Sequence, residues 1–195
     1  MTARLVAGLG NPGRRYAKTR HNIGFMATEA LGEFFSIAIT KNKFDARFGK
    51  GKIDGIDAII AQPRSFMNRS GGPVLGLARY FGVAAGDIII VHDDIDLDFG
   101  TIKIKEKGGH GGHNGLKSLI DVFGDDSFTR VRAGIGRPPP RMDVSDYVLG
   151  KFSGEESRNL DAIIEGSRDA VAAVITEGAK TAMNRFNGQR FVAQS

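Results

Sequence analysis

The chain has 195 residues, a formal net charge of +5 and no cysteine. This length suits one domain with its own core, so we expect residues 1–195 to form a single domain. The absence of cysteine excludes a disulfide framework, a thiolate nucleophile and a cysteine zinc site, and it suits a reducing cytoplasm. No apolar run is long enough to span a membrane, and the first residues lack the apolar core of a signal peptide. We therefore expect a cytoplasmic protein with no membrane partner, whose basic balance is compatible with a polyanionic one.

Strand-like and helix-like segments alternate along the chain. Strands are predicted at residues 4–9, 46–53, 58–61, 88–91, 101–105 and 128–135. Helices are predicted at residues 23–34 after Asn22, at 74–81, at 116–123, and from the capping box of Ser153 and Glu156 to about residue 175. The alternation indicates an α/β domain with a twisted, mixed but mostly parallel sheet and helices on both faces. The alternating residues 101–105 predict an edge or antiparallel strand, and Asp54-Gly55 predicts a hairpin turn.

A glycine-rich loop follows the first strand. Residues 8–13 match the dinucleotide pattern G-x-G-x-x-G. That pattern needs a helix that opens at the glycines, whereas here turn residues follow and the helical periodicity begins only near Asn22. We therefore reject a dinucleotide site and expect the loop to bring Asn11, Tyr16 and His21 to the carboxyl edge of the sheet. Taken alone, His21 is better explained as a residue at the start of the helix that makes one local hydrogen bond.

A second polar cluster spans residues 65–72, between a strand and a helix. Phe66, Met67 and Asn68 are an unusual composition for a simple connection. Two interpretations have equal weight without context. Either these residues face a ligand, or Phe66 and Met67 belong to the core while Asn68 or Ser70 caps the next helix.

The third cluster combines the end of a strand with a glycine-rich loop. Asp93 lies in the sequence His92-Asp93-Asp94 at the end of the apolar run 88–91, and residues 108–115 contain His110, His113 and Asn114. A carboxylate at a strand end is well placed to accept an imidazole N–H, which orients the imidazole for base catalysis.

A metal site is the alternative for the third cluster. The pair His110 and His113 with Asp93 or Asp94 offers suitable ligand types. A flexible glycine loop is a poor platform for a ligand pair, and no third histidine has helical or strand spacing with these two. We therefore expect no metal.

The motifs that the sequence lacks exclude several classes of reaction. It contains no nucleophile elbow G-x-S-x-G, no P-loop and no cysteine. What remains is a histidine, a strand-end aspartate and three asparagines in turn-rich loops. This set favours attack by an activated water on a carbonyl carbon, since amide side chains position water or donate to an oxyanion without adding charge.

Together the clusters resemble the bacterial peptidyl-tRNA hydrolase family. The resemblance rests on residues 8–13, 16, 19–22, 66–68, 70–71, 92–97, 108–115, 130–132 and 134–136, and it extends to Asn184-Arg185. It implies a monomeric single α/β domain without a cofactor. The implied activity is hydrolysis of the ester between the peptide and the 3′ end of tRNA in prematurely released peptidyl-tRNA.

The resemblance also implies roles for five polar residues. His21 matches the general base that activates water, and Asp93 matches the carboxylate that supports it. Asn11 matches the residue that distinguishes a blocked peptidyl amine from a free one. Asn68 and Asn114 match amides that bind the terminal region of the substrate and position water. A non-catalytic RNA-binding module is the alternative, but pure binding would not need an oriented base.

Further positions are matched to substrate contacts. The resemblance implies that Tyr16 and Phe66 contact tRNA or its 3′ end, and that Met67 and His113 line the peptide channel. We also expect a phosphate-contacting rim made of Lys103, Lys105, Lys107, Lys117, Arg130, Arg132, Arg137 and Arg141. The segments 108–115 and 137–140 are expected to be mobile borders that adjust when the 3′ end enters.

Overall fold

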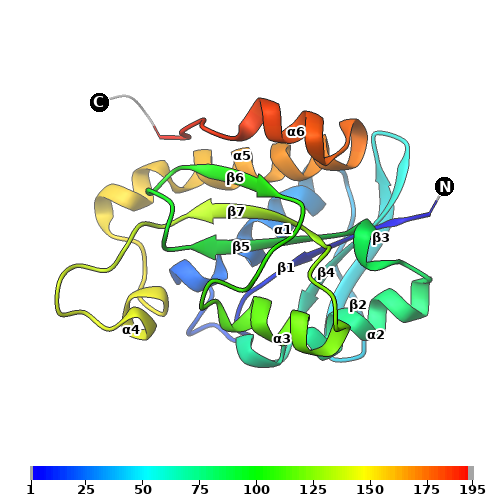
Figure 1. The fold of residues 1–195 in the computed structure, drawn as a ribbon, viewed down its shortest axis with the longest axis horizontal. Coiled ribbons are helices and arrows are strands. Elements are labelled where there is room, and N and C mark those ends of the chain that lie inside the picture. Colours follow the sequence, from blue (N-terminus) through cyan, green and yellow to red (C-terminus); the bar gives the residue numbers. More distant parts are fainter. Residues whose placement is uncertain (1, 193–195) are drawn as a thin grey trace.

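The computed structural model describes residues 2–192 of the chain. A mixed sheet forms the centre of the molecule. The strand order is β2-β3-β4-β1-β5-β7-β6, and the four inner strands β4, β1, β5 and β7 are parallel (Figure 1). The pairs β2–β3, β3–β4 and β6–β7 at the two edges are antiparallel. The strands span Arg4–Gly8 (β1), Lys41–Lys43 (β2), Ala46–Ile53 (β3), Ile56–Pro63 (β4), Ile88–Asp94 (β5), Ile102–Lys105 (β6) and Thr129–Gly134 (β7).

Helices cover both faces of the sheet, as Figure 1 shows. The helices span Ile23–Phe34 (α1), Gly71–Phe81 (α2), Asn114–Phe123 (α3), Val144–Val148 (α4), Gly154–Glu177 (α5) and Ala179–Phe186 (α6). On one face, α1, α5 and α6 share a core with alternate sheet residues such as Val6 and Val91. On the other face, α2 and α3 pack on the intervening residues such as Leu5 and Ile90. Over the described residues, none of these helices has the length and apolar character needed to cross a membrane.

The expected architecture is confirmed. The sheet is mixed and mostly parallel, and β6, which alternates between buried isoleucines and exposed lysines, is the antiparallel edge strand that the pattern predicts. Asp54 and Gly55 form the predicted hairpin turn, with φ angles of 46° and 85° in the left-handed region. The capping box of Ser153 and Glu156 begins α5.

Several boundaries and elements differ from the prediction. The helices α2 and α3 begin at Gly71 and Asn114, two or three residues earlier than the apolar periodicity suggests. The side chain of Asn22 does not cap α1, because it is bonded to the backbone of Asn11 instead. The elements β2, α4 and α6 are not among those predicted from the sequence. The first two are too short to show a hydrophobic period, since they have three and five residues.

Two glycines bring α1 directly against the sheet. A Cβ on Gly24 would lie 2.4 Å from the carbonyl oxygen of Val91, and one on Gly8 would lie 2.2 Å from the carbonyl oxygen of Gly24. Only glycine permits this backbone-to-backbone contact. The start of α1 therefore lies at the carboxyl ends of β1 and β5, and the helix does not open at residues 8–13 as a dinucleotide site would require.

Candidate active site

Three side chains that are far apart in the sequence meet at the carboxyl end of β5. His21 lies in a short 3-10 helix, Arg20–Asn22, that leads into α1, while His113 directly precedes α3. The Nδ1 atom of His21 is 2.9 Å from each carboxylate oxygen of Asp93, and the Nε2 atom of His113 is 2.9 Å from Oδ1. Asp93 is only 2% exposed. A buried carboxylate therefore accepts from two imidazoles at once.

The hydrogen bonds assign the protons of both imidazoles. The Nδ1 atom of His113 accepts from the backbone N–H groups of Gly115 and Leu116 at 3.1 and 3.3 Å, which caps α3. His113 therefore carries its proton on Nε2, from which it donates to Asp93. His21 donates to Asp93 from Nδ1, so its Nε2 keeps a lone pair. Of the two rings, His21 is the one that can accept a proton from water.

Electrostatics keep Asp93 charged and make His21 a stronger base. Burial alone would raise the pKa of Asp93, but electrostatic attraction and hydrogen bonding to the imidazoles of His21 and His113 hold this pKa far below its usual range. Burial also acts to lower the pKa of His21, and the charge and hydrogen bond of Asp93 outweigh it, so that this pKa is raised. An adjacent histidine, His92, stays neutral because burial holds its pKa well below the usual value.

The side chain of Asn11 is held in one orientation. Its backbone exchanges two hydrogen bonds of 2.9 Å with the side chain of Asn22. Its own Oδ1 accepts from the backbone N–H of Met67 at 2.8 Å. Within the described residues its Nδ2 makes no hydrogen bond. Because the oxygen is committed, Asn11 presents N–H donors to the space beside it.

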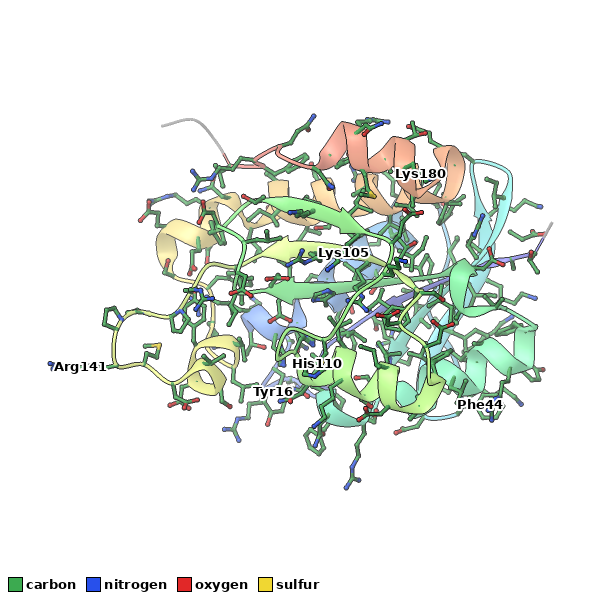
Figure 2. The ribbon with its side chains drawn as sticks, in the orientation of Figure 1. Tyr16, Phe44, Lys105, His110, Arg141 and Lys180 are labelled. Carbon is green, nitrogen blue, oxygen red and sulfur yellow. The ribbon has the colours of Figure 1, made fainter. Side chains whose placement is uncertain are left out.

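The residues above surround one cleft of about 650 Å³. His21, Asp93, Asn11, Asn68 and Asn114 all line it, and so do Phe66, Met67, His113, Lys105 and Arg132. Outside the basic rim, the structure therefore brings together every site residue expected from the sequence except Tyr16, which does not line the cleft. Figure 2 shows Tyr16 below the loop that carries His110.

Phe66 and Met67 have opposite environments. Phe66 is 58% exposed at the cleft, whereas Met67 is 4% exposed and packs in the core beneath α2 and α3. The core interpretation therefore holds for Met67 and not for Phe66, whose contact with a ligand stays a prediction. Asn68 is exposed in the 3-10 helix Met67–Arg69, and neither Asn68 nor Ser70 caps α2 with its side chain.

The expected basic rim divides into separate groups. Lys105, Arg130 and Arg132 line the cleft, where β6 and β7 pair Lys105 with Arg130. The remaining members do not line it, namely Lys103, Lys107, Lys117, Arg137 and Arg141. Figure 2 shows Lys105 facing outward above His110, while Arg141 points away at the tip of a distant loop. The rim is thus a local cationic edge of the cleft.

One group of side chains has the spacing of a metal site, but its protons oppose metal binding. The possible ligand atoms of His21, Asp93 and His113 lie within 4.8 Å of one another. A metal would need the lone pair of His113 on Nε2, whereas the cap on α3 uses the lone pair of Nδ1 and leaves a proton on Nε2. His110, which the sequence suggested as a ligand, is exposed and accepts from the backbone N–H of Gly112.

Arg20 and the α4 region help to build the site, although the sequence analysis assigned them no role. Arg20 is 8% exposed, donates to both carboxylate oxygens of Glu156 at 3.3 and 2.6 Å, and donates to the carbonyl of Tyr147. It thereby pins the His21 turn to α4 and α5. Val144 and Leu149 of the α4 region also line the cleft. No local pattern signals a contact over 136 residues of sequence.

A comparison with known protein families shows to which family this chain belongs. The family model described as peptidyl-tRNA hydrolase matches residues 5–194. The chain belongs to the peptidyl-tRNA hydrolase family. It is therefore an enzyme of the hydrolase class.

Individual relatives agree over nearly their full lengths. The chain is 44% identical over 189 residues to the peptidyl-tRNA hydrolase of Syntrophotalea carbinolica, covering 97% of this chain and 99% of the relative. It is 50% identical over 187 residues to that of Rhodococcus jostii, covering 94% and 97%. The crystal structure of peptidyl-tRNA hydrolase from Acinetobacter baumannii superposes with a TM-score of 0.91 at 37% identity, covering 97% and 96% of the two chains.

Proposed function

We propose that this protein hydrolyses the ester between a peptide and the 3′ end of tRNA, with His21 as the general base. The observation that carries the proposal is the pair formed by His21 and Asp93, in which Nδ1 is bonded to the carboxylate and Nε2 keeps a lone pair in the cleft. Family membership supplies the substrate class.

The proposed first step is attack by water on the ester carbonyl. His21 Nε2 takes a proton from the water as its oxygen bonds to the carbonyl carbon, and the imidazolium that forms is stabilised by Asp93. The imidazolium then returns the proton to the departing ribose oxygen as the ester bond breaks. Asn68 and Asn114, which border the cleft, are proposed to position the water and the terminal region of the substrate.

Asn11 is proposed to recognise a blocked α-amine by its N–H donors. An N-blocked substrate presents a carbonyl oxygen, which Asn11 Nδ2 can bond while its Oδ1 stays committed to Met67. A free aminoacyl ester presents an ammonium group, which carries only donors. Donor would then face donor, and this mismatch disfavours the free aminoacyl-tRNA.

The remaining expected contacts fit the two ends of the substrate. The exposed ring of Phe66 at the cleft suits stacking against a base of the 3′ end, and Tyr16 is proposed to contact the RNA outside the cleft. Met67 and His113 are proposed to line the peptide channel. Lys105 and Arg132 are proposed to bind phosphates, which positions the RNA without reading its sequence.

The test is hydrolysis of N-blocked and free aminoacyl-tRNA by the native protein and two variants. His21→Ala is expected to lower kcat by about 10²–10⁴-fold and to leave tRNA binding unchanged. Asn11→Asp keeps the acceptor for Met67 but replaces the N–H donors by an oxygen, so the preference for the blocked substrate should fall by about tenfold or more. Native turnover by His21→Ala would exclude the base assignment. Salt-sensitive tRNA binding without any ester cleavage by the native protein would instead indicate a binding module.

A further inference from the structure

Arg130 differs from the other cations of the cleft because its terminal nitrogens are already bonded. The residue is 2% exposed, and its guanidinium lies 4.8 Å from the ring centroid of Phe128. Nη1 donates to the carbonyl of Gly109 at 2.8 Å, and Nη2 donates to the carbonyl of Gly108 and, at 3.4 Å, to that of Asp126. A basic residue expected on a phosphate-binding rim is thus occupied by the protein backbone.

The loop that Arg130 holds has few other supports. Residues 109–112 form one side of the cleft with His110 exposed among them. The Cβ positions of Gly109, Gly111 and Gly112 have no other residue within 4 Å. After the loop, His113 is bonded to Asp93 and to the first turn of α3. The segment is therefore fixed at its start by Arg130 and at its end by His113.

Lys105 and Arg132 have a different status. The side chain of Lys105 is exposed, and its ammonium end lies beside Gly108, but within residues 2–192 it makes no side-chain hydrogen bond or ion pair. Arg132 bonds Asp94 through Nε at 2.7 Å, which leaves both of its terminal nitrogens without a partner in the described structure. These two side chains have donors available for an anion. Arg130 would have to release two loop carbonyls before its terminal nitrogens could bind a phosphate.

We propose that Arg130 is a positioning residue that clamps the Gly108–Gly112 segment as one wall of the cleft, and that it does not bind substrate phosphate. This proposal rests on the proposed function for its substrate, although the clamp itself is a property of the free protein. Loss of the clamp lets the wall move away from Asn114 and His113, which weakens the binding of the peptidyl 3′ end. The number of phosphate contacts remains the same.

The salt dependence of tRNA affinity distinguishes a residue that binds phosphate from one that only positions the loop. Each lost phosphate contact lowers the slope of log affinity against log salt by about one. We expect Lys105→Gln to lower this slope for N-blocked aminoacyl-tRNA measured through KM between about 50 and 200 mM salt. Arg130→Gln should raise KM about tenfold at each salt concentration and leave the slope unchanged. Arg130→Lys, which keeps one donor group, should recover part of the loss.

Amide hydrogen exchange of the free protein gives a second readout that needs no activity. Arg130→Gln is expected to accelerate exchange at residues 109–113 at least tenfold, while Lys105→Gln leaves these amides unchanged. If Arg130→Gln fails to fold, the same comparison of slope and exchange is made with Arg130→Lys. The proposal is overturned if the Arg130 variant lowers the salt slope as much as Lys105→Gln does. It is also overturned if amide exchange in the loop of that variant is unchanged. Absence of hydrolysis by the native protein would contradict the proposed function but not the clamp, since exchange is measured without substrate.

Discussion

On one side of the cleft the turn that carries His21 is buried and bonded on all sides, whereas on the other side the glycine loop 108–112 lies in solvent. Arg20, His21 and Asn22 are each less than 10% exposed, and each is bonded to a different part of the fold. The loop relies on Arg130 and His113 at its two ends. The difference teaches that the groups proposed for chemistry sit on the rigid side, while the side that admits substrate retains freedom to move.

On the rigid side, removing the charge of Asp93 should have the largest effect on activity. Asp93→Asn is expected to lower kcat/KM by about 10²–10⁴-fold, because the base loses its orienting carboxylate. In the native protein the pKa of His21 is raised, so activity should increase with pH as His21 loses its proton. Without the Asp93 charge, burial alone acts and lowers this pKa, which moves the acid limb of the profile to lower pH.

The pH dependence of kcat/KM for both proteins checks this prediction. Asp94→Asn is the matched control, since Asp94 also lines the cleft but is bonded to Arg132 rather than to His21. It should leave the acid limb where it is in the native protein. An Asp93→Asn limb at the native position would show that the charge does not set the basicity of His21.

Removing Arg20, which anchors the His21 turn, should have the next largest effect, and this effect is on the stability of the fold. Arg20→Met leaves the carboxylate of Glu156 without its cationic partner, with side chains that are only 10% and 16% exposed in the native pair. The free energy of unfolding should fall by about 3 kcal/mol. Urea denaturation measures it. The exposed pair of Arg137 and Asp96 is the control, where Arg137→Met should cost less than about 1 kcal/mol.

The open side should tolerate change best. Gly111 has a φ angle of 55° and no other residue within 4 Å of its Cβ position, so Gly111→Ala adds backbone strain but no clash. We expect a loss of about 1 kcal/mol in the free energy of unfolding and little change in kcat. Thermal denaturation and steady-state hydrolysis measure the two quantities. A loss as large as that of Arg20→Met would contradict the distinction between the two sides.

Much of the fold follows from local patterns in the sequence. The apolar runs of β1, β4 and β5 are typical of covered parallel strands, and the lysines that alternate with isoleucines in β6 indicate an edge. Turn residues and the capping box of α5 identify their positions because their backbone and side-chain bonds are local. Asp93 could be selected because it lies at the end of a predicted strand, and His21 and the three asparagines because they lie in polar, turn-rich segments that the predicted elements do not explain.

The tertiary structure alone decided which of these groups bond to which. Nothing near His113 in the sequence reveals that its Nδ1 caps α3 and that its Nε2 therefore donates to Asp93. Arg130 has the same residue type as Arg132 and lies two positions away, yet one holds loop carbonyls and the other presents free donors beside Asp94. The sequence by itself indicated most of the elements and the chemistry that is available. The assignment of protons and partners depended on contacts between distant segments, because burial and hydrogen bonding act through space and not along the chain.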